Sequence, residues 1–178
     1  MPIKKSQCGF SLIEVLVAVL VVSIGLVGLA GMQLVGLKGN QQSFSKNQAA
    51  HHTQSLLERM RGNSEAVING DYTVDTAVTA LNCSAGQPIN CTDAASNCSA
   101  AQIADYDIYQ AFCGSQNASS GGIRGDLSSS QLKISCNGGC ATGDVSIDIS
   151  WKEQALGKES TDSGTVSRAL KINTRISP

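Results

Sequence analysis

An uncharged apolar stretch near the N-terminus constrains this chain more than any other feature of its sequence. Residues 15–37 contain no charged side chain and no proline, and a helix needs about 20 apolar residues to cross the hydrocarbon core of a bilayer. The stretch is therefore a candidate membrane-spanning helix. Glu14 lies directly before it. An acid at mid-membrane depth disfavours insertion by about 2.5–3.5 kcal/mol, and by less near the interface, so this carboxylate indicates a functional role.

The residues that flank the apolar stretch predict its orientation and its processing. Lys4 and Lys5 are the only charged residues before Glu14, and a basic flank usually stays in the cytoplasm. The rest of the chain is then expected outside the cytoplasm. The residues after Leu34 form a poor cleavage site for an ordinary secretory signal, whereas cleavage at the small residue Gly9 would leave the helix attached.

The order of residues around Gly9 resembles the class III leader of type IV prepilins and pseudopilins. A basic leader is followed by Gly9, Phe10, Ser11, Leu12, Ile13 and Glu14, and then by the apolar helix. Residues 13–33 most closely resemble minor pilins of the PilV kind. The resemblance implies that a prepilin peptidase cuts after Gly9 and methylates the new amine of Phe10. It further implies that Glu14 faces the Phe10 amine of a neighbouring subunit, which would set the axial register between subunits.

The same resemblance implies a role in a surface filament. A PilV-like minor pilin is expected to wait in the bacterial inner membrane with its head in the periplasm, and then to enter a type IV pilus. There it would help to prime assembly and would sit in the tip complex, supporting adhesion and twitching motility. Its expected partners are the prepilin peptidase, the inner-membrane assembly platform, the major pilin, other minor pilins and a large tip adhesin.

Two alternatives to the minor-pilin interpretation remain open from the sequence. The first is a pseudopilin of a type II secretion system, because the leader is common to both systems. The second is an unrelated single-pass receptor or enzyme whose helix is not cleaved from its leader. Retention of the bond between Gly9 and Phe10 in the mature protein would distinguish the second alternative.

Three glycines recur at every third position of the apolar stretch, at Gly25, Gly28 and Gly31. Each lowers helix propensity by about 1 kcal/mol relative to alanine. Glycines in membrane helices commonly let neighbouring helices approach closely. The alternative hypothesis is that they let this segment unwind or stretch when the subunit leaves the bilayer for the filament. Major pilins often carry a proline where this chain has Gly31, so the chain departs from the family pattern there.

The helix is expected to continue beyond the membrane segment as an amphipathic helix. Residues 38–61 contain no proline, and four apolar residues, Phe44, Leu56, Leu57 and Met60, are predicted to share one face. Gly62 and Asn63 supply a stop signal. The predicted organisation is a leader over residues 1–9, a membrane and filament-core helix over 10–37, an amphipathic helix over 38–62 and a head over 63–178.

Seven cysteines predict a head that is stabilised by disulfides. Cys8 would be lost with the leader, which leaves an even number in the mature chain: Cys83, Cys91, Cys98, Cys113, Cys136 and Cys140. Outside the cytoplasm such a set favours up to three disulfides. A zinc site is the alternative, but the sequence has no CxxC pair. Spacing leaves the pairing open, with a weak preference for Cys136 with Cys140 because turn residues separate them.

The remainder of the head predicts one short helix and an antiparallel sheet. Residues 100–113 have helical periodicity, and Asp105 and Asp107 are expected on the solvated side of that helix. Residues 132–136, 145–151 and 166–176 alternate between apolar and polar side chains, as half-buried strands do. The amphipathic helix is the natural cover for their apolar face. The predicted fold is therefore α+β, a pilin-like lollipop with disulfide-stapled loops.

The sequence offers little that could support catalysis or nucleic-acid binding. It contains no GxSxG, no HExxH and no phosphate-binding glycine loop, so no catalytic residue and no cofactor is expected. The adjacent residues His51 and His52 point about 100° apart on a helix and are predicted to be solvated rather than metal ligands. The net charge is −1 and no basic stripe with interleaved aromatics is present, which disfavours a nucleic-acid partner.

Overall fold

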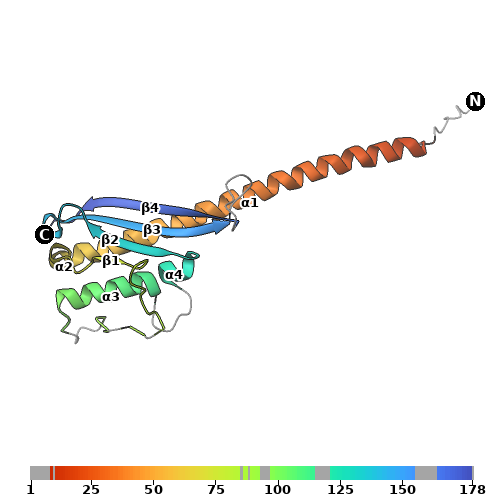
Figure 1. The fold of residues 1–178 in the computed structure, drawn as a ribbon. Helices are drawn as coiled ribbons and strands as arrows, with labels where there is room; N and C mark the ends of the chain where they lie inside the picture. The colour runs from red at the N-terminus through yellow and green to blue at the C-terminus, as the bar shows by residue number, and fades with distance from the viewer. Residues whose placement is uncertain are drawn as a thin grey trace, which may run out of the picture. The chain divides into compact units, whose positions relative to one another are not determined.

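The computed structural model describes residue 9 and residues 11–84, 86–87, 89–92, 97–114, 121–154 and 164–177. Within these residues, Figure 1 shows a long helix, shorter helices and an antiparallel sheet. The helices are α1 (Leu12–Gly62), α2 (Ser64–Asn69), α3 (Ala100–Cys113) and α4 (Gly122–Asp126), with a 3₁₀ turn, η1 (Cys140–Thr142). The strands are β1 (Val74–Asp75), β2 (Gln131–Cys136), β3 (Asp144–Gln154) and β4 (Thr165–Arg175).

The chain divides into two compact units, and the boundary falls within α1. The N-terminal unit extends to Gln42, and the second unit, the head, runs from Ser43 to Pro178. In the N-terminal unit the described chain is almost entirely helical, and its helix is long and apolar enough to cross a membrane. The prediction of a long helix that ends at Gly62 is confirmed.

The sheet of the head has the strand order β1-β2-β3-β4, and all its neighbouring strands are antiparallel. Leu132 pairs with Ile149, and Ile149 pairs with Leu170, so apolar side chains of three strands form one row on the same face. The alternation along β3 buries Val145, Ile147, Ile149 and Trp151. The predicted antiparallel meander is present, and the two-residue strand β1 extends it by one strand that the sequence pattern did not predict.

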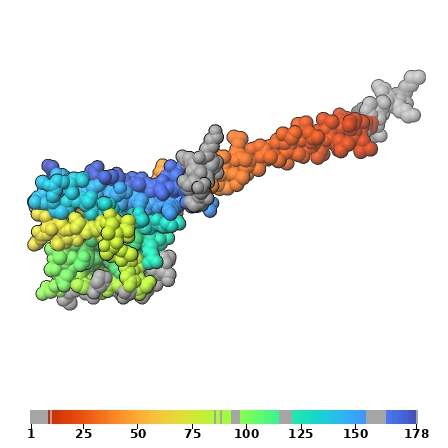
Figure 2. All heavy atoms as spheres, in the orientation of Figure 1, coloured from red at the N-terminus to blue at the C-terminus, as the bar shows by residue number. Residues whose placement is uncertain are grey.

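One hydrophobic cluster joins the sheet to the helices of the head. It contains Leu56 and Met60 from α1, Phe112 from α3 and Ile147 from β3. Figure 2 shows the blue C-terminal strands and the green α3 on opposite sides of the head. The α+β fold predicted from the sequence, with its disulfide-stapled loops, is therefore confirmed.

One residue of the predicted apolar face of α1 was assigned wrongly. The buried residues of α1 are Ala49, Thr53, Leu56, Leu57 and Met60, whereas 61% of Phe44 is exposed. Leu56 follows Phe44 by twelve residues, which at about 100° per residue places the two side chains about 120° apart around the helix. Phe44 therefore points away from the buried face.

Local signals explain where the head's helices and turns begin and end. Ser99 caps α3, because its hydroxyl accepts from the Gln102 N–H at 3.3 Å while the Gln102 side chain accepts from the Ser99 N–H at 2.9 Å. Gly143, the residue between η1 and β3, has φ +70°, and a Cβ at this position would lie 2.1 Å from the Ile176 carbonyl oxygen. Only glycine fits this close approach.

Candidate functional site

The first candidate site is the apolar segment of α1, residues 12–37. Its large apolar side chains are exposed to between 52% at Val15 and 83% at Leu12. An apolar surface of this extent marks a contact with lipid or with other proteins. By length and composition the helix can cross a membrane, which fits anchoring in the inner membrane.

The start of α1 holds the predicted processing and register residues. Gly9 is exposed, and Phe10 lies outside the described residues. Glu14 is exposed in the first turn of the helix, and its backbone N–H donates to the Ser11 carbonyl at 3.0 Å. A carboxylate in a first turn interacts favourably with the helix dipole. The roles of Gly9, Phe10 and Glu14 in cleavage, methylation and register remain predictions.

The glycines of the apolar segment lie in a helix without breaks. A Cβ added to Gly25, Gly28 or Gly31 would meet no heavy atom within 4 Å. Packing within the subunit therefore does not require glycine at any of these positions. If glycine is needed there, the reason is either contact with another molecule or unwinding of the helix, and helix flexibility remains a prediction.

All six cysteines predicted to remain in the mature chain form disulfides. Cys83 pairs with Cys113, Cys91 with Cys98, and Cys136 with Cys140. The first bond ties the segment after β1 to the end of α3, across 30 residues of sequence. The third is the pairing that the intervening turn residues favoured.

A buried polar network joins the end of α1 to α3, and it corrects the sequence prediction for Asp107. Only 5% of Asp107 is exposed, although it was expected on the solvated side of the helix; Asp105 is exposed. One oxygen of Asp107 accepts from the Arg59 guanidinium at 2.9 Å and the other from the Tyr72 hydroxyl at 2.6 Å. The buried surface of α3 is wider than a single apolar stripe and includes Asp107. This side chain faces α1 and the residues after α2.

The electrostatics of this network favour a neutral phenol. Burial, followed by the hydrogen bond to Asp107, raises the pKa of Tyr72 far above its usual value near 10. Asn63 donates to the Ala100 carbonyl at 2.8 Å, which fixes the residue after α1 against the start of α3. The network orients the end of α1 against α3.

Replacing Asp107 with alanine is expected to destabilise the head by about 2–4 kcal/mol. The substitution removes the acceptor of a buried hydroxyl and the partner of Arg59, whose side chain is 42% exposed and so keeps part of its hydration. Chemical denaturation of the full chain in detergent measures the change. Asp105→Ala is the matched control and should stay within about 0.5 kcal/mol of the parent. Equal losses of stability in the two variants would contradict the assignment of Asp107 to a buried network that stabilises the head.

The two histidines differ in their surroundings, which partly corrects the prediction that both are solvated. His51 is exposed. The side chain of His52 is only 15% exposed, and its Nε2 lies 2.7 Å from an Asp126 carboxylate oxygen, so the pair connects α1 to α4. Among the described residues, no group of three or more His, Cys, Asp or Glu side chains could hold a metal ion.

Two comparisons with known protein families bear on this arrangement. Residues 4–30 match the family model described as the prokaryotic N-terminal methylation motif, which covers most of the predicted leader and most of the apolar segment. Residues 31–109 match the family model of type IV pilin Tt1218, from the middle of α1 into α3. No curated protein and no solved structure matches the chain significantly. Together with the apolar helix and the disulfide-stapled α+β head, the two matches support a type IV pilin.

Proposed function

We propose that this protein is a minor pilin that helps to prime assembly of a type IV pilus and sits in its tip complex, supporting adhesion and twitching motility. The observation that carries the proposal is the leader motif joined to an apolar helical segment that is exposed on all sides. Such a segment needs an apolar environment at every stage. A bilayer provides it before assembly, and the packed helices of other subunits provide it afterwards.

The proposed sequence of events follows from this need. The leader implies processing by a prepilin peptidase, which would cut after Gly9 and methylate the amine of Phe10. The mature subunit would wait in the inner membrane with its head in the periplasm, and the assembly platform would then move it into the filament. The head would contact the major pilin, other minor pilins and a large tip adhesin.

Glu14 would set the axial position of the subunit in the filament. Among packed apolar helices an isolated carboxylate is unfavourable, whereas a carboxylate that faces the ammonium group of a neighbouring Phe10 is compensated. Only one axial offset brings these two groups together. The subunit would therefore act as a building block, as pilins do, and catalysis is not part of the proposed role.

Deletion of the gene in the native bacterium tests the choice of system. We expect loss of surface pili by electron microscopy and smaller twitching zones, with normal export of secreted enzymes. Complementation with the parent chain should restore both phenotypes, and complementation with Gly9→Val should not. Loss of exoprotein secretion with intact pili would contradict the proposal and would instead indicate a pseudopilin of a type II secretion system.

A further inference from the structure

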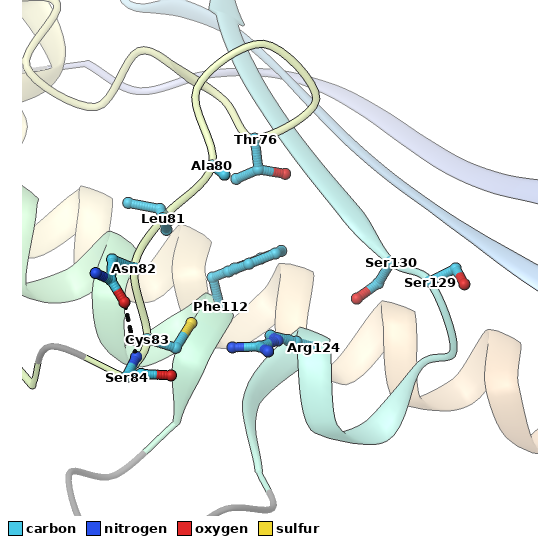
Figure 3. Close-up of a pocket in the computed structure, with 10 residues that line it drawn as sticks. All are labelled: Thr76, Ala80, Leu81, Asn82, Cys83, Ser84, Phe112, Arg124, Ser129 and Ser130. Atoms are coloured by element: carbon cyan, nitrogen blue, oxygen red, sulfur yellow. Dashed lines mark hydrogen bonds between the residues drawn. The ribbon is translucent and has the colours of Figure 1, made fainter.

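A groove of about 600 Å³ opens on the head. Figure 3 shows its walls: the segment after β1 forms one side, and α4 with the turn before β2 forms the other. Ten residues line the groove: Thr76, Ala80, Leu81, Asn82, Cys83, Ser84, Phe112, Arg124, Ser129 and Ser130. None of these residues takes part in the proposed assembly contacts of the N-terminal helix.

Arg124 gives the groove a positive charge that no carboxylate among the described residues pairs with. The other four arginines of the chain each pair with a carboxylate: Arg59 with Asp107, Arg61 with Glu58, Arg168 with Glu153 and Arg175 with Asp144. Arg124 has no such partner among the described residues, and it is exposed. Its guanidinium carries five donors in a fork that matches a carboxylate. The groove is thus suited to a ligand that brings a carboxylate.

The walls of the groove also present unused backbone groups. Within the described parts of the chain, neither the peptide groups of Ala80 nor those of Ser129 have a hydrogen-bond partner. The two residues lie on opposite walls. Such peptide groups are free to hydrogen-bond the main chain of a bound peptide.

The groove is held in shape before any ligand arrives. The Cys83–Cys113 disulfide fixes one wall to the end of α3, and on the other wall the Ser130 hydroxyl donates to the Ile123 carbonyl at 3.1 Å. Pre-organised walls lower the entropic cost of binding. Phe112 is only 6% exposed, so its ring offers no open face on which a sugar could stack.

We propose that this groove binds a short acidic segment of a partner protein, with a ligand carboxylate on Arg124 and main-chain hydrogen bonds to Ala80 and Ser129. The apolar side chains beside the carboxylate would rest against Leu81 and the Cys83–Cys113 disulfide. The proposal concerns the head alone, so it holds whether the subunit works in a pilus or in a secretion system. It goes beyond the proposed function because it identifies a binding site and the chemistry of its occupant.

Titration of the full mature chain in detergent micelles tests the groove directly. The probe is the peptide N-acetyl-Ala-Val-Glu-Val-amide, followed by chemical-shift changes of ¹⁵N-labelled protein. We expect saturable changes at the amides of Ala80, Leu81 and Ser129. The same peptide with glutamine in place of glutamate should bind about five- to tenfold more weakly, because it lacks the charge-assisted bond.

Variants of the protein separate a specific site from general charge attraction. Arg124→Gln should weaken binding of the glutamate peptide about five- to tenfold, and Arg124→Lys should retain part of the affinity. Lys171→Gln removes the same charge from an exposed position on β4 outside the groove and should leave binding unchanged. The unfolding midpoint of each variant should match the parent, because Arg124 has no described partner to lose.

Three results would overturn the proposal. They are the absence of a saturable change at the groove amides up to about 10 mM peptide, equal affinity for the glutamate and glutamine peptides, and an unchanged affinity in Arg124→Gln. Methyl glucuronide serves as a second probe. Saturable binding of this sugar at the groove without binding of the peptide would assign the groove to an acidic glycan and would also overturn the peptide proposal.

Discussion

Replacing Glu14 with leucine is expected to leave the subunit in the inner membrane but to remove it from the filament. Glu14 is the only acidic residue before Glu58, and it lies directly before the uncharged residues 15–37. Loss of its carboxylate would leave the Phe10 ammonium of the adjoining subunit unpaired among apolar helices. Breaking a buried pair in this way costs about 3–5 kcal/mol, and each 1.4 kcal/mol is about tenfold in an equilibrium.

The measurement is the amount of subunit in sheared pili relative to the amount in membranes, by quantitative immunoblot. We expect this ratio to fall at least about tenfold in Glu14→Leu, and less in Glu14→Asp. Glu58→Leu is the matched control, because Glu58 lies on the same helix in an exposed pair with Arg61, and exposed pairs contribute little. A parental ratio in Glu14→Leu would contradict the proposed role of Glu14.

Removing the Cys83–Cys113 disulfide is expected to lower the free energy of unfolding of the head by about 3–4 kcal/mol. The bond closes a loop of 30 residues, and the chain-entropy relation gives a larger loss for longer loops. The same relation predicts about 2 kcal/mol for Cys136–Cys140, which spans only four residues. Cys113 also belongs to the hydrophobic cluster, so its replacement by serine adds a packing penalty.

Denaturant unfolding of the full chain under non-reducing conditions compares the two double variants, Cys83→Ser with Cys113→Ser and Cys136→Ser with Cys140→Ser. The first pair should show the lower midpoint, and adding a reductant to the parent should lower its midpoint at least as far. A larger loss of stability in the Cys136 and Cys140 double variant would show that loop length does not determine which disulfide stabilises the head more.

The features that sequence analysis predicted correctly depend on short-range patterns. The strand pattern in β3 is carried by alternate residues such as Ile147 and Ile149, and the stop of α1 by Gly62 with Asn63. The Cys136–Cys140 bond was favoured because the residues between the two cysteines form a turn. In each case the residues that determine the structure lie within a few positions of one another, so their spacing in the sequence is enough to predict it.

The features that sequence analysis missed depend on tertiary contacts. Asp107 is separated from Arg59 by 48 residues, and no local pattern distinguishes a carboxylate that meets an arginine from one that meets water. The two-residue strand β1 is too short to show an alternating pattern in the sequence. It forms because its residues pair with the edge of β2. Counting positions around α1 more strictly would have placed Phe44 correctly.

The candidate sites also divide into those that the sequence predicts and those that only the fold reveals. The leader residues and Glu14 could be proposed from the order of residues alone, because the motif is contiguous in the sequence. The groove at Arg124 could not, since its walls come from segments about 50 residues apart, and the fold is needed to see which arginine has no carboxylate partner within the described residues. The pairing of Cys83 with Cys113 likewise required the packing of α3.

The most direct test of the central claim is the mass of the mature N-terminus in protein from the native membrane. Intact mass and N-terminal peptide mass spectrometry should show a chain that begins with N-methylated Phe10. In the Gly9→Val variant the leader should remain attached and the methyl group should be absent. A parental chain that still carries the bond between Gly9 and Phe10 would contradict the account, because the subunit would then be an anchored membrane protein that never enters a filament.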